Sequence, residues 1–404
     1  MVERKLGINN KLILTGAVLV SFFIFAPYAF ADTIGESRNF FVNSKYDEFS
    51  RAVLSATLRH ASDRAYFYVD DRYWAGLDQL EKNIFLNNLD GLGGEFDNNI
   101  YPKETNFFGP EPNPGIDGDA RVVILVEDLV KGNGGYFETA NLYSKKLSPE
   151  SNEREMVAIN NESLSSFGKV FLAHEFQHLI SFNQKDLLRD ASEDVWLNEL
   201  RSEYANTVVG YNGSSQNSNL NRRIDTFLSE PSDSLVEWPN VVLDYSQVAL
   251  FAEYIAEQFG PRIISETLKN DLVGIDSINK FLQSGGRPER FSNIFGNWLT
   301  ANYLNGSSSD SRYGYMRSEL KNIRITPNQY FLPYPGKYEL NYDLKPWQGS
   351  WHKLNLYYMP KDKVLKISFN SADGFKLWYA DNLGNTGELK NGSYLINTGD
   401  LNSV

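Results

Sequence analysis

The stretch FLAHEFQHLI, residues 171–180, decides how the rest of the chain is interpreted. Its apolar residues recur three and four positions apart, which predicts a helix that packs against a core. His174 and His178 are two of only four histidines in the chain, and their spacing puts both imidazoles on one helix face, within reach of one ion. Glu175 is displaced by about 100° around the helix, where its carboxylate can act on a water molecule beside the ion without being a ligand.

An amphipathic core helix whose histidines are satisfied by hydrogen bonds is the alternative interpretation. The helix does pack, as the apolar residues of the stretch indicate: Phe171, Leu172, Phe176, Leu179 and Ile180. Packing does not require a histidine pair with a glutamate between them, however, so the pattern favours a metal site.

A third protein ligand is needed, because zinc in a catalytic site takes three and keeps a fourth position for water. The chain has no cysteine, so the ligand must be histidine, aspartate or glutamate. His60 lies in an early strand-like region and His352 in a late one, which leaves a carboxylate downstream of His178 as the better candidate.

A second helix is predicted around WLNELRSEY, residues 196–204, with Ser192 and the acidic residues after it as its start signal. Glu199 and Glu203 are four residues apart and share a face of this helix. One of them can bind the metal while the other accepts the N–H of a ligand histidine and fixes its tautomer. The spacing alone does not assign the two roles.

The organisation of the chain follows from changes in hydrophobic period. Strands are predicted at 52–58, 65–69, 121–126 and 156–159, with a helix at about 77–88 and a Pro/Gly-rich loop at 101–119. After Asn160 the period becomes helical, at 163–182, 192–209, 245–259 and 288–304, and strand alternation returns at 351–357 and 364–369. We therefore expect an α+β fold divided into an N-terminal α+β part (32–160), a mainly helical lobe (161–305), a linker (306–335) and a small all-β domain (336–404). The strand pattern continues up to Val404, so a truncated β domain is one interpretation of this end.

Residues 1–31 have the pattern of an export signal. A positively charged start is followed by an apolar run from Leu12 to Phe30, and Ala29-Phe30-Ala31 is typical of a cleavage site. An uncleaved anchor is the alternative, because the run is about long enough to span a bilayer, but Pro27 and the small residues near the cut favour cleavage. We expect a bacterial protein that is secreted or extracytoplasmic, without a stable membrane span after cleavage.

The composition and net charge of the chain indicate which kinds of partner it can bind. The chain has 404 residues, 42% of them hydrophobic, and a net charge of -12 without a basic block. This composition gives enough apolar surface for a packed core and offers no electrostatic basis for binding nucleic acid. Asp117 and Asp119 could hold Ca²⁺, although Asp-Gly at this position is more often a turn. The composition does not indicate an oligomeric state.

His174-Glu175-x-x-His178, followed by Trp196-Leu197-Asn198-Glu199-x-x-Ser202-Glu203-Tyr204, resembles the gluzincin zinc peptidases. The resemblance implies that Glu199 is the third zinc ligand and Glu203 the partner that orients a ligand histidine. The glycine usual after this glutamate is Leu200 here, a departure that removes no ligand. The whole resemblance covers roughly 53–304.

Within that group the chain is most similar to the hyicolysin-like neutral metallopeptidases of bacteria. The supporting stretches are FGPEPNPGIDGD (108–119), GYF (135–137), SNEREM (151–156) and HEFQH (174–178). The resemblance implies a thermolysin-like catalytic domain, a mixed sheet plus a helical lobe, in which an edge strand beside the zinc pairs with the substrate backbone. We expect 121–126 or 156–159 to supply that strand. Tyr245, in a Tyr-led helix like that of several gluzincins, is the expected donor to the oxyanion.

The function that follows is a secreted zinc endopeptidase acting on proteins or peptides. His174, His178 and Glu199 would hold one catalytic Zn²⁺, and Glu175 would be the general base that acts on the activated water. One alternative is a non-catalytic surface adhesin or carbohydrate-binding protein that keeps a peptidase fold, although the presence of Glu175 argues against it. Another is a purely structural ion, which a fourth protein ligand in place of water would indicate.

Overall fold

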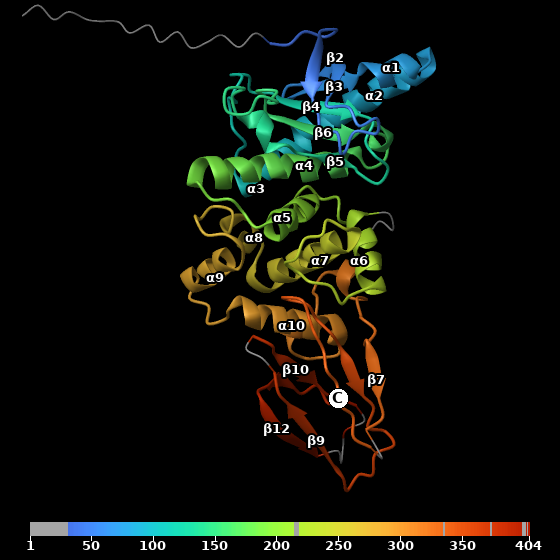
Figure 1. The fold of residues 1–404 in the computed structure, drawn as a ribbon, viewed down its shortest axis with the longest axis vertical. Helices are drawn as coiled ribbons and strands as arrows, with labels where there is room; N and C mark the ends of the chain where they lie inside the picture. Colours follow the sequence, from blue (N-terminus) through green and yellow to red (C-terminus); the bar gives the residue numbers. More distant parts are fainter. Residues whose placement is uncertain (1–30, 214–217, 334–335, 372–373, 398–400, 402) are drawn as a thin grey trace, which may run out of the picture.

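The computed structural model describes residues 31–213, 218–333, 336–371, 374–397, 401 and 403–404. The expected export signal, except for Ala31, lies outside these residues. Figure 1 shows an elongated molecule with a sheet and its helices at one end, a stack of helices in the middle and small sheets at the other end. Within the described residues, no helix combines the length and the apolar character needed to cross a bilayer.

A six-stranded mixed sheet forms the N-terminal end of this stack. Its strands, in spatial order, are β1 (Ser37–Phe41), β2 (Val53–Ala61), β3 (Ala65–Asp70), β4 (Val122–Glu127), β6 (Met156–Asn160) and β5 (Gly135–Tyr136). β3, β4 and β6 run parallel, and the outer strands pair antiparallel with their neighbours. The strands expected at 52–58, 65–69, 121–126 and 156–159 are confirmed as β2, β3, β4 and β6, and the fold is mixed α+β.

The edge strand of the sheet differs from the expectation. β4 lies between β3 and β6, and β6 is paired with β4 on one side and with β5 on the other. Residues 121–126 and 156–159 therefore offer no free edge of the kind that a substrate strand would need, and that expectation was wrong. The edge strand on this side of the sheet is β5, which is two residues long and too short to give any periodic signal in the sequence.

Alternate side chains of the central strands serve two cores, as a strand period of two requires. Ile124 and Val126 of β4 join the large core under the helices, while Val123 and Leu125 join a second cluster on the other face. All six residues of β4 are buried. This complete burial explains why its sequence reads as a continuous apolar run.

The described residues before 305 also form helices: α1 (Asp71–Gly76), α2 (Gln79–Glu95), α3 (Tyr101–Phe108), α4 (Gly168–Phe182), α5 (Val195–Val208), α6 (Asn219–Ser229), α7 (Val242–Phe259), α8 (Arg262–Glu266), α9 (Gly274–Ser284) and α10 (Phe291–Leu304). The five helices expected from the sequence correspond to α2, α4, α5, α7 and α10. α3 corrects the loop expected at 101–119. Pro102, which has no backbone N–H, lies at the start of α3 directly after the π-helical turn Phe96–Ile100, where the regular α-helical hydrogen bonding is already interrupted.

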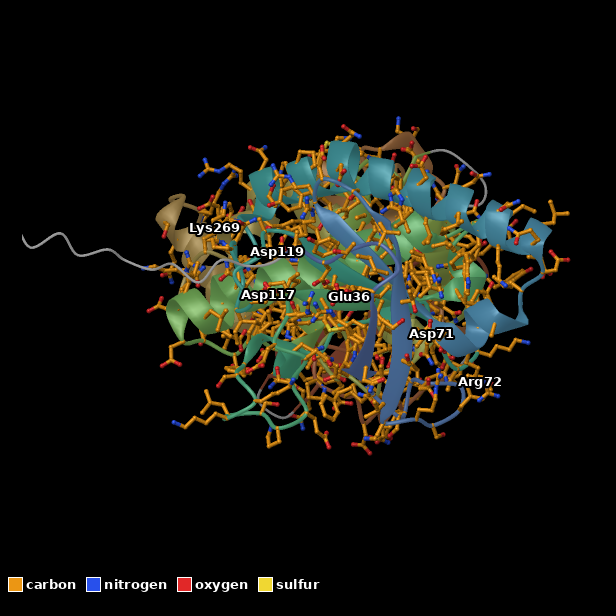
Figure 2. All side chains as sticks on the ribbon, turned by 90° about the horizontal axis from the view of Figure 1, so that it is seen from above. Glu36, Asp71, Arg72, Asp117, Asp119 and Lys269 are labelled. Carbon is orange, nitrogen blue, oxygen red and sulfur yellow. The ribbon has the colours of Figure 1, made fainter. Side chains whose placement is uncertain are left out.

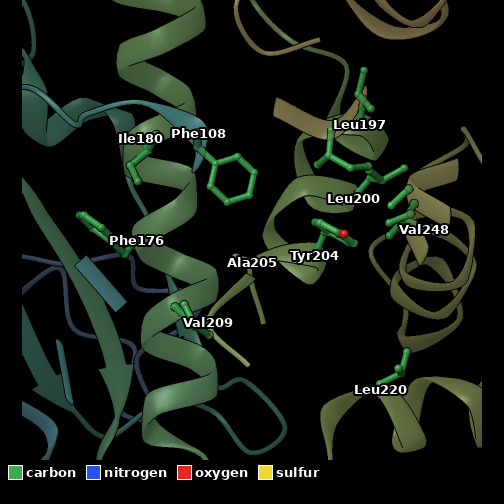
Figure 3. Close-up of a cluster of buried hydrophobic side chains, with 14 of the residues drawn as sticks. Phe108, Phe176, Ile180, Leu197, Leu200, Tyr204, Ala205, Val209, Leu220 and Val248 are labelled. Carbon is green, nitrogen blue, oxygen red and sulfur yellow. The ribbon is translucent and has the colours of Figure 1, made fainter. Parts of the chain in front are cut away.

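α4 is buried on all sides, since every residue except Lys169 and Phe171 is at most 9% exposed. It lies between the sheet and α5 (Figure 1). Figure 3 shows the packing on its far side, where Phe108 of α3 and Leu200 of α5 fill the space between α4 and α7. Leu200 is fully buried, which stabilises the fold by about 1.5–3 kcal/mol relative to an exposed side chain. The polar residues of α4 are held in place by the same packing.

The stretch after α10, which falls within the linker expected at 306–335, packs against the helices as far as Ile325. Tyr313, Tyr315, Leu320 and Ile323 are buried against the helices, and the Asn305 amide donates to the carbonyl oxygens of Leu320 and Ile323, both at 2.8 Å. The flexible composition of Gly306 to Ser309 gave no indication of these later apolar anchors.

Short two-stranded sheets follow: β7 (Gln329–Phe331) with β8 (His352–Leu354), β9 (Val364–Phe369) with β12 (Gly392–Asn397), and β10 (Leu377–Ala380) with β11 (Thr386–Leu389). The strand expected at 364–369 is confirmed as β9. Trp347 packs on Phe291 of α10, and the Trp351 indole N–H donates to the Leu299 carbonyl oxygen at 2.9 Å. This β region therefore contacts the helical part directly.

Replacing Tyr315 by phenylalanine tests the packed segment. The Tyr315 hydroxyl accepts from the Trp298 indole N–H at 2.9 Å and donates to Asn302 Oδ1 at 2.7 Å, in a buried setting. Tyr315→Phe leaves both groups without a partner, and we expect the free energy of unfolding to fall by about 1–3 kcal/mol in urea denaturation. Tyr357→Phe, at a residue 66% exposed, is the matched control and should change little. Equal stability of the two variants would contradict the packed arrangement.

Candidate metal centre

Three ligand atoms from α4 and α5 converge on one point. His174 Nε2 lies 3.1 Å from Glu199 Oε2 and 3.2 Å from His178 Nε2, and His178 Nε2 lies 3.5 Å from Glu199 Oε2. Zinc bonds of about 2.0–2.1 Å in tetrahedral geometry separate neighbouring ligand atoms by about 3.3–3.4 Å. The two nitrogens and one oxygen therefore fit a zinc ion in both chemistry and spacing.

The outer nitrogens of both imidazoles face hydrogen-bond acceptors. His174 Nδ1 lies 3.5 Å from Glu203 Oε1. His178 Nδ1 lies 3.1 Å from Ser202 Oγ, whose hydroxyl donates to Gln177 Oε1 at 2.6 Å and is therefore free to accept from the ring. With the protons on Nδ1, the Nε2 lone pairs of both rings point to the shared site. No sequence pattern assigned a role to Ser202, although this residue lies one turn after Glu199.

Glu203 is buried and keeps its charge through Arg223 of α6. The Arg223 guanidinium donates to both carboxylate oxygens, at 2.6 and 3.0 Å, and the Asn219 amide donates at 2.9 Å. Burial alone would raise the pKa of Glu203, but Arg223 holds it below its ordinary value. Glu203 thus lies behind His174, on the side of Nδ1, while Glu199 lies at the point that the two Nε2 atoms share. Arg223 carries no sequence signal, because it lies twenty residues after Glu203 on another helix.

Glu175 lies in the same buried space as the three ligand residues and is not one of them. Burial raises the pKa of its carboxyl to about 8, His178 opposes the rise, and Glu199 and Glu203 add to it. Gly135 of β5 packs against it so closely that a Cβ there would lie 2.8 Å from Glu175 Cγ and 2.7 Å from the Ala158 carbonyl oxygen. Glycine is therefore needed at this position of the edge strand.

Tyr245 of α7 borders the site. Its ring centroid lies 6.2 Å from that of His174, and its hydroxyl donates to Asn240 Oδ1 at 2.9 Å. Burial and then Glu199 raise the pKa of this phenol far above its ordinary value, so the hydroxyl keeps its proton and can donate it in a hydrogen bond. Trp238, edge-on at 5.0 Å, fixes the ring from the other side.

A cleft of about 360 Å³ opens onto the ligand atoms. β5 lines one side, together with Glu138, and the end of α4 and the start of α5 line another. Tyr46, from the segment after β1, also lines the cleft and stacks on Tyr136 of β5, with ring centroids 5.1 Å apart. No sequence pattern indicated that Tyr46 lines the cleft, because its position depends on a contact with Tyr136, ninety residues later in the chain.

Asp117 and Asp119 do not line this cleft and contact other protein groups. Figure 2 shows both on the face seen from above. Asp119 accepts from the Tyr66 hydroxyl at 2.9 Å, and Asp117 lies 3.7 Å from the Arg154 guanidinium. Among the described residues, the cluster of three or more acidic or histidine side chains suited to a metal is His174, His178 and Glu199. These contacts do not add support for calcium.

Comparisons with known proteins agree with this geometry. No protein-family model matches the chain. The chain is 30% identical over 265 residues to the neutral metalloprotease ShpI of Staphylococcus hyicus, an alignment that covers 57% of this chain and 53% of that protein. The resemblance to bacterial neutral metallopeptidases is therefore confirmed, and the chain spans about half the length of this curated relative.

Two crystal structures of a mutant M1 zinc metallopeptidase from Deinococcus radiodurans, one of them bound to a Tyr-Ser-Ala substrate, were also found. They share 12% and 13% sequence identity with this chain and cover 65% of it, and 57% and 56% of their own chains. TM-scores of 0.31 and 0.29 are too low to establish a common fold.

Removing the guanidinium that holds Glu203 tests the orientation of His174. Arg223→Met removes the cation and both of its hydrogen bonds to the buried carboxylate, so that Glu203 no longer fixes the imidazole. We expect the affinity for Zn²⁺ to fall by about 10- to 100-fold, measured by competition with a chromophoric chelator. Arg262→Met, at a side chain 79% exposed, is the matched control. Unchanged affinity in Arg223→Met would show that Glu203 does not orient the ligand.

Proposed function

We propose that this chain is a zinc-dependent endopeptidase with a gluzincin-type catalytic site. The observation that carries the proposal is the convergence of His174 Nε2, His178 Nε2 and Glu199 Oε2 at 3.1–3.5 Å, with Glu175 beside them. Within the described residues this group has three protein ligands and no fourth, which fits a catalytic ion with an open position better than a closed structural one. The similarity to a neutral metalloprotease supports the same class.

In this proposal each residue of the site has a defined task. Zn²⁺, when bound, supplies a Lewis acid that polarises a water molecule and the scissile carbonyl. Glu175 takes a proton from the attacking water on a carboxylate oxygen and delivers it to the nitrogen of the leaving amine. Tyr245 donates its hydroxyl hydrogen to the oxyanion that develops on the carbonyl oxygen. β5, as the edge strand, hydrogen-bonds the extended substrate backbone beside Glu175.

The proposed layout assigns the catalytic domain to 32–305, with the edge strand in 32–160 and the helical lobe in 161–305. Any linker to the β region of 336–404 begins after Ile325, because the preceding residues are packed. Residues 1–31 are proposed as an export signal, which makes the mature protein secreted or extracytoplasmic. Proteins and peptides are the proposed substrates.

Hydrolysis of casein tests the catalytic assignment. Glu175→Gln keeps the shape of the side chain and removes its basicity, so we expect zinc binding to persist while hydrolysis falls by about 10²–10⁴-fold or more. Chelation should abolish cleavage by the unchanged protein, and added Zn²⁺ should restore it. A Glu175→Gln protein that keeps near full activity would exclude this residue as the base.

Blocked peptides separate an endopeptidase from an aminopeptidase. An N-acetylated, C-amidated peptide has no free terminus, so its cleavage at an internal bond supports the endopeptidase. If only a peptide with a free amino terminus is cleaved, the protein is still a zinc peptidase, but the proposal that it is an endopeptidase is contradicted. No cleavage of any substrate, with one zinc per chain bound, would favour the binding-protein alternative.

Removing the hydroxyl of Tyr245 tests the oxyanion donor. Tyr245→Phe keeps the ring between His174 and Trp238, so the zinc affinity should not change. We expect kcat to fall by about 10²–10³-fold with little change in KM, because the lost hydrogen bond forms in the transition state. Tyr330→Phe, at a residue 61% exposed, is the control. A rise in KM at constant kcat would assign Tyr245 to substrate binding.

A further inference from the structure

Asp32 is buried, although it directly follows the Ala29-Phe30-Ala31 motif and Ala31 is exposed. Its side chain is only 2% exposed and binds two guanidinium groups, Arg38 and Arg154, each at 2.6 Å. The Tyr68 hydroxyl donates to the same carboxylate at 2.8 Å. The start of a domain normally frays unless it is held. Here the first residue after the expected cleavage site is held by three side chains.

The backbone nitrogen of Asp32 also has a defined partner. It lies 3.2 Å from the Tyr66 hydroxyl oxygen in a buried setting. Tyr66 donates its own hydrogen to Asp119 Oδ2 at 2.9 Å and accepts from the Arg121 guanidinium at 2.7 Å. The nitrogen of Asp32 is thus linked through the Tyr66 hydroxyl to the carboxylate of Asp119, whose cation partner Arg121 lies 4.0 Å away.

The charges around Asp32 do not balance. Arg38 also pairs with Glu36 at 2.7 Å, and Arg154 also approaches Asp117. The network has four carboxylates and three guanidinium groups, the members being Asp32, Glu36, Asp117, Asp119, Arg38, Arg121 and Arg154. Burial raises the pKa of Asp117 even though Arg154 opposes the rise. Glu155, a fifth carboxyl beside it, has its pKa raised by burial to about 7. Without Glu155, one more positive charge would balance the four carboxylates against the three guanidinium groups.

We propose that hydrolysis of the Ala31–Asp32 peptide bond creates this missing cation, and that the new amino terminus of Asp32 docks on Tyr66 within the network. Hydrolysis by a signal peptidase consumes one water, leaves a carboxylate on Ala31 and leaves an amine on Asp32. An α-amino group has a pKa of about 7.7–8.0, so near neutral pH it takes up a proton and becomes an ammonium. The inference rests on the proposed export signal and is independent of the peptidase activity.

The docked end continues into the catalytic cleft. At the end of β1, the Phe41 backbone N–H donates to Asn152 Oδ1 at 2.9 Å, and two residues later the Asn43 amide donates to Glu138 Oε1 at 2.5 Å. Tyr46 then stacks on the edge strand. The segment from Asp32 to Tyr46 is therefore fixed at one end by the charge network and forms part of the cleft wall at the other. Docking of the new terminus would hold this wall in place.

The experiment uses the full chain, exported by a bacterial host and purified from outside the cytoplasm. Mass spectrometry first identifies its amino terminus, which we expect at Asp32. The native protein is then acetylated near neutral pH with an N-hydroxysuccinimide ester, and labelling of the terminal peptide is compared with that in urea. A docked terminus should be labelled at about one tenth of the rate in the unfolded chain, or at a lower rate.

Variants away from the cleavage site show whether the network causes the protection. Asp119→Asn removes the carboxylate that Tyr66 contacts, and Tyr66→Phe removes the hydroxyl itself; both should speed labelling of the native terminus. Tyr330→Phe should leave it unchanged. An amino terminus other than Asp32 overturns both the cleavage and the docking. A terminus at Asp32 that labels as fast in the folded as in the unfolded chain overturns the docking alone, and casein hydrolysis reports the peptidase separately.

Discussion

The packing of α4 against α5 is the constraint on which the candidate site depends. α4 carries two imidazoles and a carboxylate, α5 carries two more carboxylates, and each of these groups is largely withdrawn from water. Burying charged carboxylates is costly unless cations or hydrogen-bond donors compensate them. Arg223 compensates Glu203 from α6. Glu199 faces the two histidines, and a divalent cation at their common point would compensate it fully.

The helix pair α4 and α5 contributes both to the hydrophobic core and to the candidate metal site. Leu200 of α5, which stands where related sites have glycine, is fully buried and faces the core shared with α7, so its side chain does not enter the cleft. Ser202 and Glu203 lie on the face of α5 turned to α4, where they accept from the imidazoles. One face of α5 thus serves the core and another serves the site. Small changes in the packing of α5 would change both the core and the ligand geometry.

The sheet contributes the other half of the cleft through its shortest strand. β5 pairs with β6 through only two residues, yet it brings Gly135 into contact with Glu175 and Tyr136 under Tyr46. A two-residue strand has no period, so no pattern could have singled it out. α3 was missed for a related reason, because Pro102 and the glycines after it masked a helix whose apolar residues are held by α4 and α5. In the segment after α10, the flexible composition of Gly306 to Ser309 gave no indication of the buried tyrosines that follow.

The sequence by itself determined the local part of the site. His174, Glu175 and His178 share one helix, and the helical repeat fixes their relative positions regardless of the rest of the fold. Glu199 followed from a second helix with a distinctive stretch of residues. Only the tertiary structure decided that Glu199 meets the histidines within 3.5 Å, that Arg223 holds Glu203 while Ser202 contacts His178, and that β5 and Tyr46 line the cleft. These contacts join segments distant in the chain, and the packing of whole elements sets them, which no local pattern encodes.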